Sequence, residues 1–181
     1  VRTLDAQLGA GRLSGSGDWT PSGGWAFEGR VQAMDPSALH SAVASQAVNG
    51  QLALRGQQSD VAFDLDLSSP PLVDARGRLA LRTAQARGRW AAGTLTLEAL
   101  RLQAADALLE GQLTMRLAEA SGEGRLRMAV PGLQAQAEGA LARDQGEGRF
   151  SLQATDLSRT QAWAARLPMV GDAVAAWAVQ G

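Results

Sequence analysis

The feature that most constrains this chain is a four-residue motif that recurs along its length. The motif is a residue that is most often charged, then Gly, then Arg, Gln or Ala, then a large apolar residue. Its copies begin at Glu28, Asn49, Arg76, Arg87, Glu110, Glu123, Glu138 and Glu147, with a looser copy at Ala10. After most copies apolar and polar residues alternate, which is the pattern of a half-buried β-strand. The spacing of the copies leaves room for one strand or one hairpin each, so the sequence predicts a mostly β, elongated antiparallel meander.

The segment from residue 60 to 68 shows the alternation most clearly. Large apolar residues occupy its odd positions from Val61 to Leu67, while Asp64 and Asp66 lie on the opposite face. An unpaired carboxylate is costly to bury in an apolar core, so the face with the aspartates must be wet. We therefore expect a sheet with one apolar face and one polar face.

We expect the large apolar residues of all strands to share the apolar face. The predicted residues of this surface are Trp25, Phe27, Val61, Phe63, Leu65, Leu67, Leu79, Leu81, Leu95, Leu97, Leu113, Met115, Leu117, Leu126, Met128, Phe150 and Leu152. The alternation changes phase between Leu97 and Leu100, which predicts a β-bulge near Glu98 and Ala99.

Two segments break the β pattern and predict short helical insertions, at about residues 36–48 and 157–179. Each follows an aspartate placed to cap a helix, Asp35 before Pro36 and Asp156 before the second segment. The surrounding residues repeat at a constant offset of 121 positions (153 − 32). A repeated unit of strand, Asp-capped helix and strand is typical of stacked, elongated architectures.

Trp163, Leu167 and Trp177 fall on one stripe of the second insertion at helical spacing. Two interpretations remain open for this stripe. The helix can pack against the sheet, or it can act as a plug that covers the apolar groove.

The composition argues against several classes of function. Net charge is −1, which disfavours nucleic acid as a partner, because phosphate binding needs a basic surface. The chain has no Cys and a single His, His40, with no partner at metal-ligand spacing. We predict no catalytic residues, no metal and no cofactor, and hence no enzyme. The 181 residues fit one segment, and the chain starts and stops inside its pattern, so we expect it to be a piece of a longer repetitive β domain.

The strand starts with Gly, the strand–Asp–helix units and the run Asn49–Gly56 resemble the periplasmic part of the TamB family, large members of the AsmA-like group. The resemblance extends over essentially the whole chain and lies in pattern rather than in a unique motif. It implies an open, U-shaped β-taco or half-barrel groove, apolar inside and polar outside. It also implies a periplasmic location in a diderm bacterium, as part of a protein anchored in the inner membrane. The anchor, and the region that meets an outer-membrane barrel of the TamA type, would lie outside this segment.

The resemblance predicts that the groove conducts phospholipid between the inner and outer membranes and supports outer-membrane biogenesis. An alternative function is a structural or assembly scaffold that offers sheet edges to outer-membrane β-barrel proteins by strand addition. A transmembrane barrel is disfavoured because aromatic girdles are missing. A passenger-type β-helix accommodates the Asp-capped insertions poorly.

Overall fold

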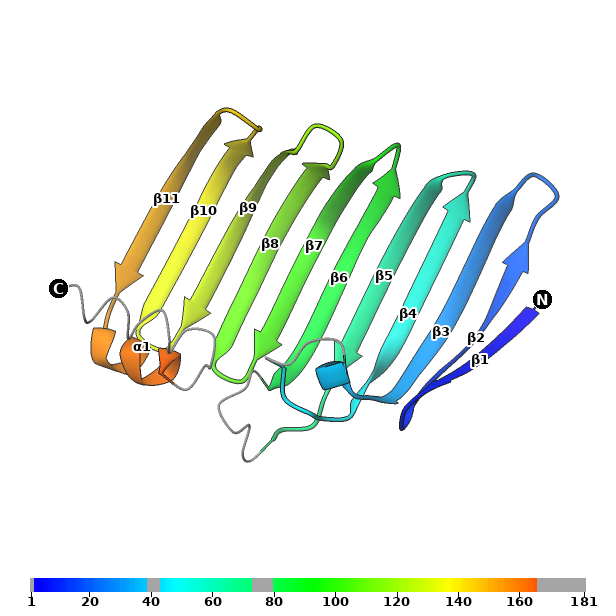
Figure 1. The fold of residues 1–181 in the computed structure, drawn as a ribbon, viewed down its shortest axis with the longest axis horizontal. Coiled ribbons are helices and arrows are strands. Elements are labelled where there is room, and N and C mark those ends of the chain that lie inside the picture. Colours follow the sequence, from blue (N-terminus) through cyan, green and yellow to red (C-terminus); the bar gives the residue numbers. More distant parts are fainter. Residues whose placement is uncertain (1, 39–42, 73–79, 166–181) are drawn as a thin grey trace.

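The chain folds into one open sheet of eleven antiparallel strands (Figure 1). A computed structural model describes residues 2–38, 43–72 and 80–165. The strands are β1 (Arg2–Leu8), β2 (Gly11–Trp19), β3 (Gly24–Met34), β4 (Val48–Gln57), β5 (Asp60–Ser68), β6 (Leu81–Ala91), β7 (Thr94–Ala104), β8 (Ala107–Arg116), β9 (Ser121–Val130), β10 (Leu133–Leu141) and β11 (Gly146–Ala154). The predicted mostly β, open antiparallel meander is confirmed.

The strands lie in the order of the sequence, so each one pairs only with the strands before and after it. The connections from β2 to β3, β4 to β5, β6 to β7, β8 to β9 and β10 to β11 are all tight and lie along one edge of the sheet, at the top of Figure 1. We call this the hairpin edge. The opposite edge carries both helical insertions. Strands β1 and β11 end the sheet, and among the described residues each pairs with a strand on one side only.

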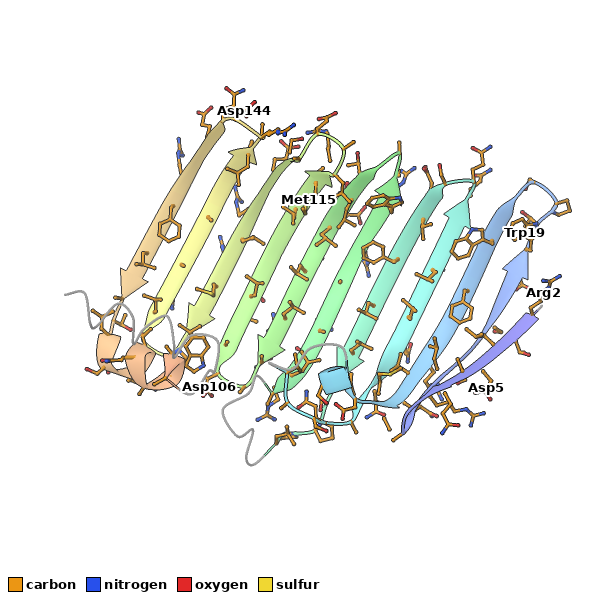
Figure 2. All side chains as sticks on the ribbon, viewed as in Figure 1. Arg2, Asp5, Trp19, Asp106, Met115 and Asp144 are labelled. Atoms are coloured by element: carbon orange, nitrogen blue, oxygen red, sulfur yellow. The ribbon has the colours of Figure 1, made fainter. Side chains whose placement is uncertain are left out.

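Strand register keeps the apolar residues of neighbouring strands on the same face. Leu54 lies opposite Phe63, and Leu65 lies opposite both Leu52 and Ala86. Because side chains alternate along a strand, these pairs define one apolar face that runs across the whole sheet. It is the face turned toward the reader in Figure 2, where Met115 is labelled.

The other face, which we call the polar face, carries ion pairs between neighbouring strands. Arg87 pairs with Asp64 at 2.8 Å, and four further pairs lie between neighbouring strands. These are Arg12–Asp5, Arg89–Asp60, Arg101–Glu110 and Arg125–Glu138. All are largely exposed, and such pairs contribute little stability each, about 0–1 kcal/mol. They favour the observed register because a slip would place like charges opposite one another.

The predicted β-bulge near Glu98 and Ala99 is confirmed. Pairing of β7 with β8 shifts between Leu97 and Leu100, and pairing of β6 with β7 shifts at the same place. The bulge adds one residue to β7 relative to its neighbours, so the alternation of its side chains between the two faces is reversed beyond it. Leu100 therefore joins Leu97 on the apolar face instead of pointing to the polar one.

Glycines on the apolar face make room for large side chains of the next strand. A Cβ built at Gly56 would lie 2.2 Å from the ring of Trp25, and one at Gly88 would lie 2.8 Å from Phe63 Cζ. The Gly88 position is also closed by the backbone, since Thr96 O would be 2.3 Å away. Both glycines thus allow an aromatic ring to lie across the neighbouring strand.

The helix predicted at 36–48 is not present over the described residues of that range. Pro36–Ala38 form a 3₁₀ turn, residues 43–47 are not helical, and Val48 already belongs to β4. Residues 39–42 lie outside the described residues. The Asp35 carboxylate accepts from Ser37 N at 2.9 Å and from Ser45 Oγ at 2.5 Å. A continuous helix would carry Ser45 about 15 Å away from Asp35, so the second bond excludes one helix over the whole range.

The second insertion contains a true α-helix, α1 (Leu157–Ala164), within the predicted range 157–179. Asp156 caps it as predicted, accepting from Arg159 N at 3.1 Å. Thr160 ties the helix to the β9–β10 turn by donating to Pro131 O at 2.9 Å. Residues 166–179 of this prediction lie outside the described residues.

The described part of the sheet is a single layer with almost no interior. No large side chain in it is fully buried, and the few buried apolar residues are small, such as Ala84 and Ala135, or lie at the edge with the insertions, such as Val48. Most of the large residues on the apolar face are therefore only partly covered, by their neighbours within the sheet.

We predict that Gly88→Ala destabilises the sheet by about 1–3 kcal/mol, because the added methyl group cannot fit between Thr96 O and Phe63. Gly24→Ala is the matched control. The closest atom to a Cβ there is the side-chain atom Thr20 Oγ1 at 3.0 Å, and the nearest backbone atom, Gly56 O, is 3.9 Å away. Chemical denaturation monitored by circular dichroism measures both variants. Equal stabilities for Gly88→Ala and Gly24→Ala would contradict the role of Gly88.

Candidate functional site

The structure brings most of the predicted surface residues together on the apolar face. Fifteen of the predicted residues lie in strands β3, β5, β6, β7, β8, β9 and β11. Leu117 lies instead in the hairpin that follows β8, where it is 55% exposed. Leu79 lies outside the described residues.

Several residues of the apolar face were missing from the prediction. Leu52 and Leu54 line up with Leu65 and Phe63, and Leu141 lies beside Gly122 and Gly146. The others include Trp19, Trp90, Leu100, Leu102 and Leu109. The signal was present, because each follows the same alternation as its predicted neighbours. Each strand has two alternating sets of side chains. Only the strand register shows which set lies on the same face as the apolar residues of the neighbouring strand.

The apolar face is hollowed at its C-terminal end, next to the hairpin edge. A groove of about 870 Å³ lies over β8 to β11. Its apolar walls include Leu113, Met115, Leu126, Leu141 and Phe150. Leu141 is 72% exposed and Phe150 69% exposed, so these walls are open to the solvent. We call this hollow the apolar groove.

The floor of the apolar groove is formed by backbone. Gly124, Gly139 and Gly148 are register partners on β9, β10 and β11. For Gly139 and Gly148, the nearest atoms to an added Cβ are all backbone atoms. This differs from Gly56 and Gly88, where an aromatic ring is among the nearest atoms, and from Gly124, where Leu113 Cδ1 would be 3.2 Å away.

A second hollow, of about 1020 Å³, lies over the same region on the polar face. Its lining includes Glu98, Glu110, Glu123, Arg125 and Glu138. A twisted sheet is saddle-shaped, so each face is concave along one diagonal. The polar hollow was not predicted, since strand alternation fixes which residues share a face but not how the sheet curves.

In the polar hollow, Glu138 forms an ion pair with Arg125 of the neighbouring strand. Arg125 Nη2 donates to its carboxylate at 2.6 Å. This hydrogen bond, and the positive charges of Arg125 and Arg149, lower the pKa of Glu138 from its ordinary value. The three residues form an alternating row of charges across β9, β10 and β11. They hold the exposed end of the sheet in register.

Of the predicted plug residues, only Trp163 is described. It lines a hollow of about 640 Å³ with Leu108, Ala129 and Pro131. Leu108 and Ala129 alternate with residues of the apolar face, so this hollow lies away from the apolar groove. Leu167 and Trp177 are outside the described residues, and the plug stays a prediction.

Among the described residues, no group of three or more His, Asp or Glu side chains is arranged to hold a metal ion. His40 lies outside them. No helix within residues 2–38, 43–72 and 80–165 is long and apolar enough to cross a membrane. The absence of an enzymatic activity stays a prediction.

Searches against protein-family models, curated proteins and solved structures find no match to this chain. The resemblance to the TamB family therefore rests on the sequence pattern alone and stays a prediction.

We predict that Glu138 makes part of the stability of the sheet depend on pH. Because its pKa is lowered by folding, the stabilisation is complete above the pKa of the unfolded chain and is lost as pH falls through the folded value. The melting temperature should therefore fall less between pH 6 and pH 3 in Glu138→Gln than in the wild type. Glu28→Gln is the control and should behave as wild type, because Glu28 lies on the same face and forms no ion pair with any described residue. Identical acid sensitivity in all three proteins would contradict this role.

Proposed function

We propose that this chain is a segment of a lipid conduit, in which the apolar face carries the acyl chains of phospholipids while head groups stay in water. One observation supports this most directly. The apolar face is continuous across eleven strands, yet in the described residues it is not covered by a second layer. A soluble domain normally buries such a surface, and large exposed apolar surfaces typically mark binding sites.

The physical basis of transfer is passive. Removing one methylene group from water is worth about 0.8 kcal/mol, so an apolar strip along the molecule holds an acyl chain without covalent chemistry. Because each row of the face crosses all strands, a chain can move along the long axis of the sheet by exchanging one set of apolar contacts for another. Motion of this kind needs no metal, no cofactor and no catalytic residue.

The cellular setting is also part of this proposal. Together with the resemblance to TamB proteins, an open apolar face favours transport of phospholipid between the two membranes of a diderm bacterium, through the periplasm, in support of outer-membrane biogenesis. In that setting, membrane anchoring and the contact with an outer-membrane barrel of the TamA type belong to regions outside this segment.

We predict that Met115→Arg blocks lipid passage while leaving most of the folding stability intact. Met115 lines the open apolar groove, so the stem of an arginine can bend its charge toward water, and the folding cost should be modest. The charge still interrupts the apolar strip. Leu65→Arg, in the middle of the sheet, should act in the same way.

Thr114→Arg is the matched control for Met115→Arg, since Thr114 is the neighbouring residue on the polar face. Melting temperature and lipid transfer between vesicles should be measured on the same variants in the longer protein. Transfer lost only in step with folding would mean that the apolar face is a filled core in the whole protein. Normal transfer with arginine at 115 and at 65 would refute the conduit.

The second candidate function, an assembly scaffold, has an observation of its own. Within the part of the chain that the structure describes, strand β11 has no partner on one side, and all nine of its residues are exposed. An edge strand of this length can receive a strand of another protein through backbone hydrogen bonds. This function depends on the edge and not on the apolar face.

We predict that proline in β11 separates the two functions. Thr155 N donates to Gly132 O on the β10 side at 2.9 Å, and N–H groups alternate along a strand, so Ser151 N–H points to β10 and Leu152 N–H to the free edge. Ser151→Pro therefore removes a hydrogen bond to β10, and Leu152→Pro blocks only the free edge. Because Leu152 also lies on the apolar face, Leu152→Ala is the control, and if the chain is a conduit the two Leu152 variants should transfer lipid equally well. Loss of outer-membrane protein assembly in Leu152→Pro, with lipid transfer intact, would favour the scaffold.

A further inference from the structure

The apolar groove differs from the rest of the apolar face because it is bordered by two charged hairpins. The β8–β9 hairpin lines it through Arg116, Leu117 and Ala120, and the β10–β11 hairpin begins at its wall residue Leu141. The two hairpins follow one another along the hairpin edge, and Figure 2 shows Asp144 at that edge, beyond the tip of β10 and β11. The groove is thus an apolar space with a charged border on one side.

Each of these two hairpins carries one arginine and one acid. The first has Arg116, at the end of β8, and Glu119, and the second has Arg143 and Asp144. Arg116 lines the groove itself, and the other three lie in the turns beyond it. All four are exposed. Within the part of the chain that the structure describes, none of them forms an ion pair, in contrast to the paired arginines on the polar face. Glu119 only accepts a hydrogen bond from Ser121, at 3.3 Å.

We propose that the apolar groove is a docking site for a zwitterionic phospholipid, with an acyl chain in the groove and the head group between the two hairpins. This inference rests on the proposed conduit function and goes further, because it names a place on the sheet and a class of head group. The volume of about 870 Å³ lies in the range of small-molecule sites, roughly 300–1,000 Å³.

Charge complementarity selects the head group. A phosphate fits the guanidinium groups of Arg116 and Arg143, and an ammonium group fits the carboxylates of Glu119 and Asp144. A head group with only negative charge would meet the two acids as well as the two arginines. An uncharged head would leave both kinds of group without a partner. A phosphoethanolamine or phosphocholine head group carries a phosphate for the arginines and an ammonium group for the acids.

The position of the groove explains why a lipid would dock at this end of the sheet rather than in its middle. It lies over β8 to β11, at the end of the sheet, where the floor is the backbone of Gly139 and Gly148. Elsewhere on the face, large side chains such as Trp25 and Phe63 fill the equivalent space over glycines. A lipid can therefore settle more deeply at this end than in the middle of the sheet.

The first experiment locates the lipid. Phe150, a wall of the groove, and Phe63, on the same face but three strands away from β8, the nearest strand of the groove, are replaced one at a time by the photo-crosslinking residue p-benzoylphenylalanine. The chain is irradiated with phosphoethanolamine lipid vesicles and analysed by mass spectrometry. Crosslinking at 150, with or without crosslinking at 63, supports the docking site. Crosslinking at 63 alone overturns it but leaves the conduit standing. No lipid at either position overturns both.

The second experiment tests the head group. Short-chain diacyl lipids with phosphoethanolamine or phosphoglycerol heads, and the matching diacylglycerol, are titrated by calorimetry into the wild type and into the double variant Arg116→Gln/Arg143→Gln. We expect the double variant to bind the phosphoethanolamine lipid roughly three- to tenfold more weakly, the sum expected of two exposed charge contacts. Its affinity for diacylglycerol should be unchanged.

Arg30→Gln/Arg127→Gln is the matched control, because it removes two exposed arginines from the polar face. It should bind every probe as the wild type does. Equal affinity of the wild type for diacylglycerol and for the phosphoethanolamine lipid would overturn the role of the hairpins. Tighter binding of the phosphoglycerol lipid would overturn the preference for a zwitterion. Neither result would contradict lipid binding to the apolar face. The conduit function is tested separately, by lipid transfer in Met115→Arg.

Discussion

The structure depends on keeping one phase of alternation through eleven strands. A shift of a single residue in any strand would turn its apolar side chains to the wet face and its charges to the apolar one. Bulges can therefore occur only where the sequence changes phase as well. The bulge between Leu97 and Leu100 meets this condition, and so does the one in β3, where Ala33 adopts a positive φ of 49° and donates its N–H to Asn49 Oδ1 at 2.9 Å. The apolar face remains continuous because each irregularity is matched in the sequence.

Glycine provides the second condition for a sheet without an interior. In a layered protein, large side chains pack against another layer. Here Trp25 and Phe63 pack sideways, over Gly56 and Gly88 of the next strand. The recurrent motif thus combines two roles, since its charged residue faces water and its glycine receives a neighbour's side chain. At Gly139 and Gly148 the nearest atoms are backbone atoms instead of a neighbour's side chain, and there the face opens into the apolar groove.

Much of the fold could be predicted because alternation and turn residues are local signals. The meander, the wet face of Asp64 and the bulge at Glu98 all follow from them. The first insertion was predicted as one helix, but its described residues form only a 3₁₀ turn, since Ser45, ten residues away in the sequence, bonds back to Asp35. The groove and the polar hollow could not be predicted either. They depend on the curvature of the sheet and on Leu141 and Phe150 being left uncovered, and neither is encoded in the order of apolar and polar residues.

The order of the strands has a consequence for how the chain reaches this structure. Every strand pairs with its predecessor in the sequence, so no contact within the sheet has to wait for a distant part of the chain. Each new pair of strands closes only the loop between two consecutive strands, which favours rapid formation of native pairs. The sheet can grow one hairpin at a time from the N-terminus, with β1 and β2 as a template for β3. A protein that enters its compartment as an extended chain could then fold progressively behind the point of entry, with each new strand pairing to the growing edge as it emerges.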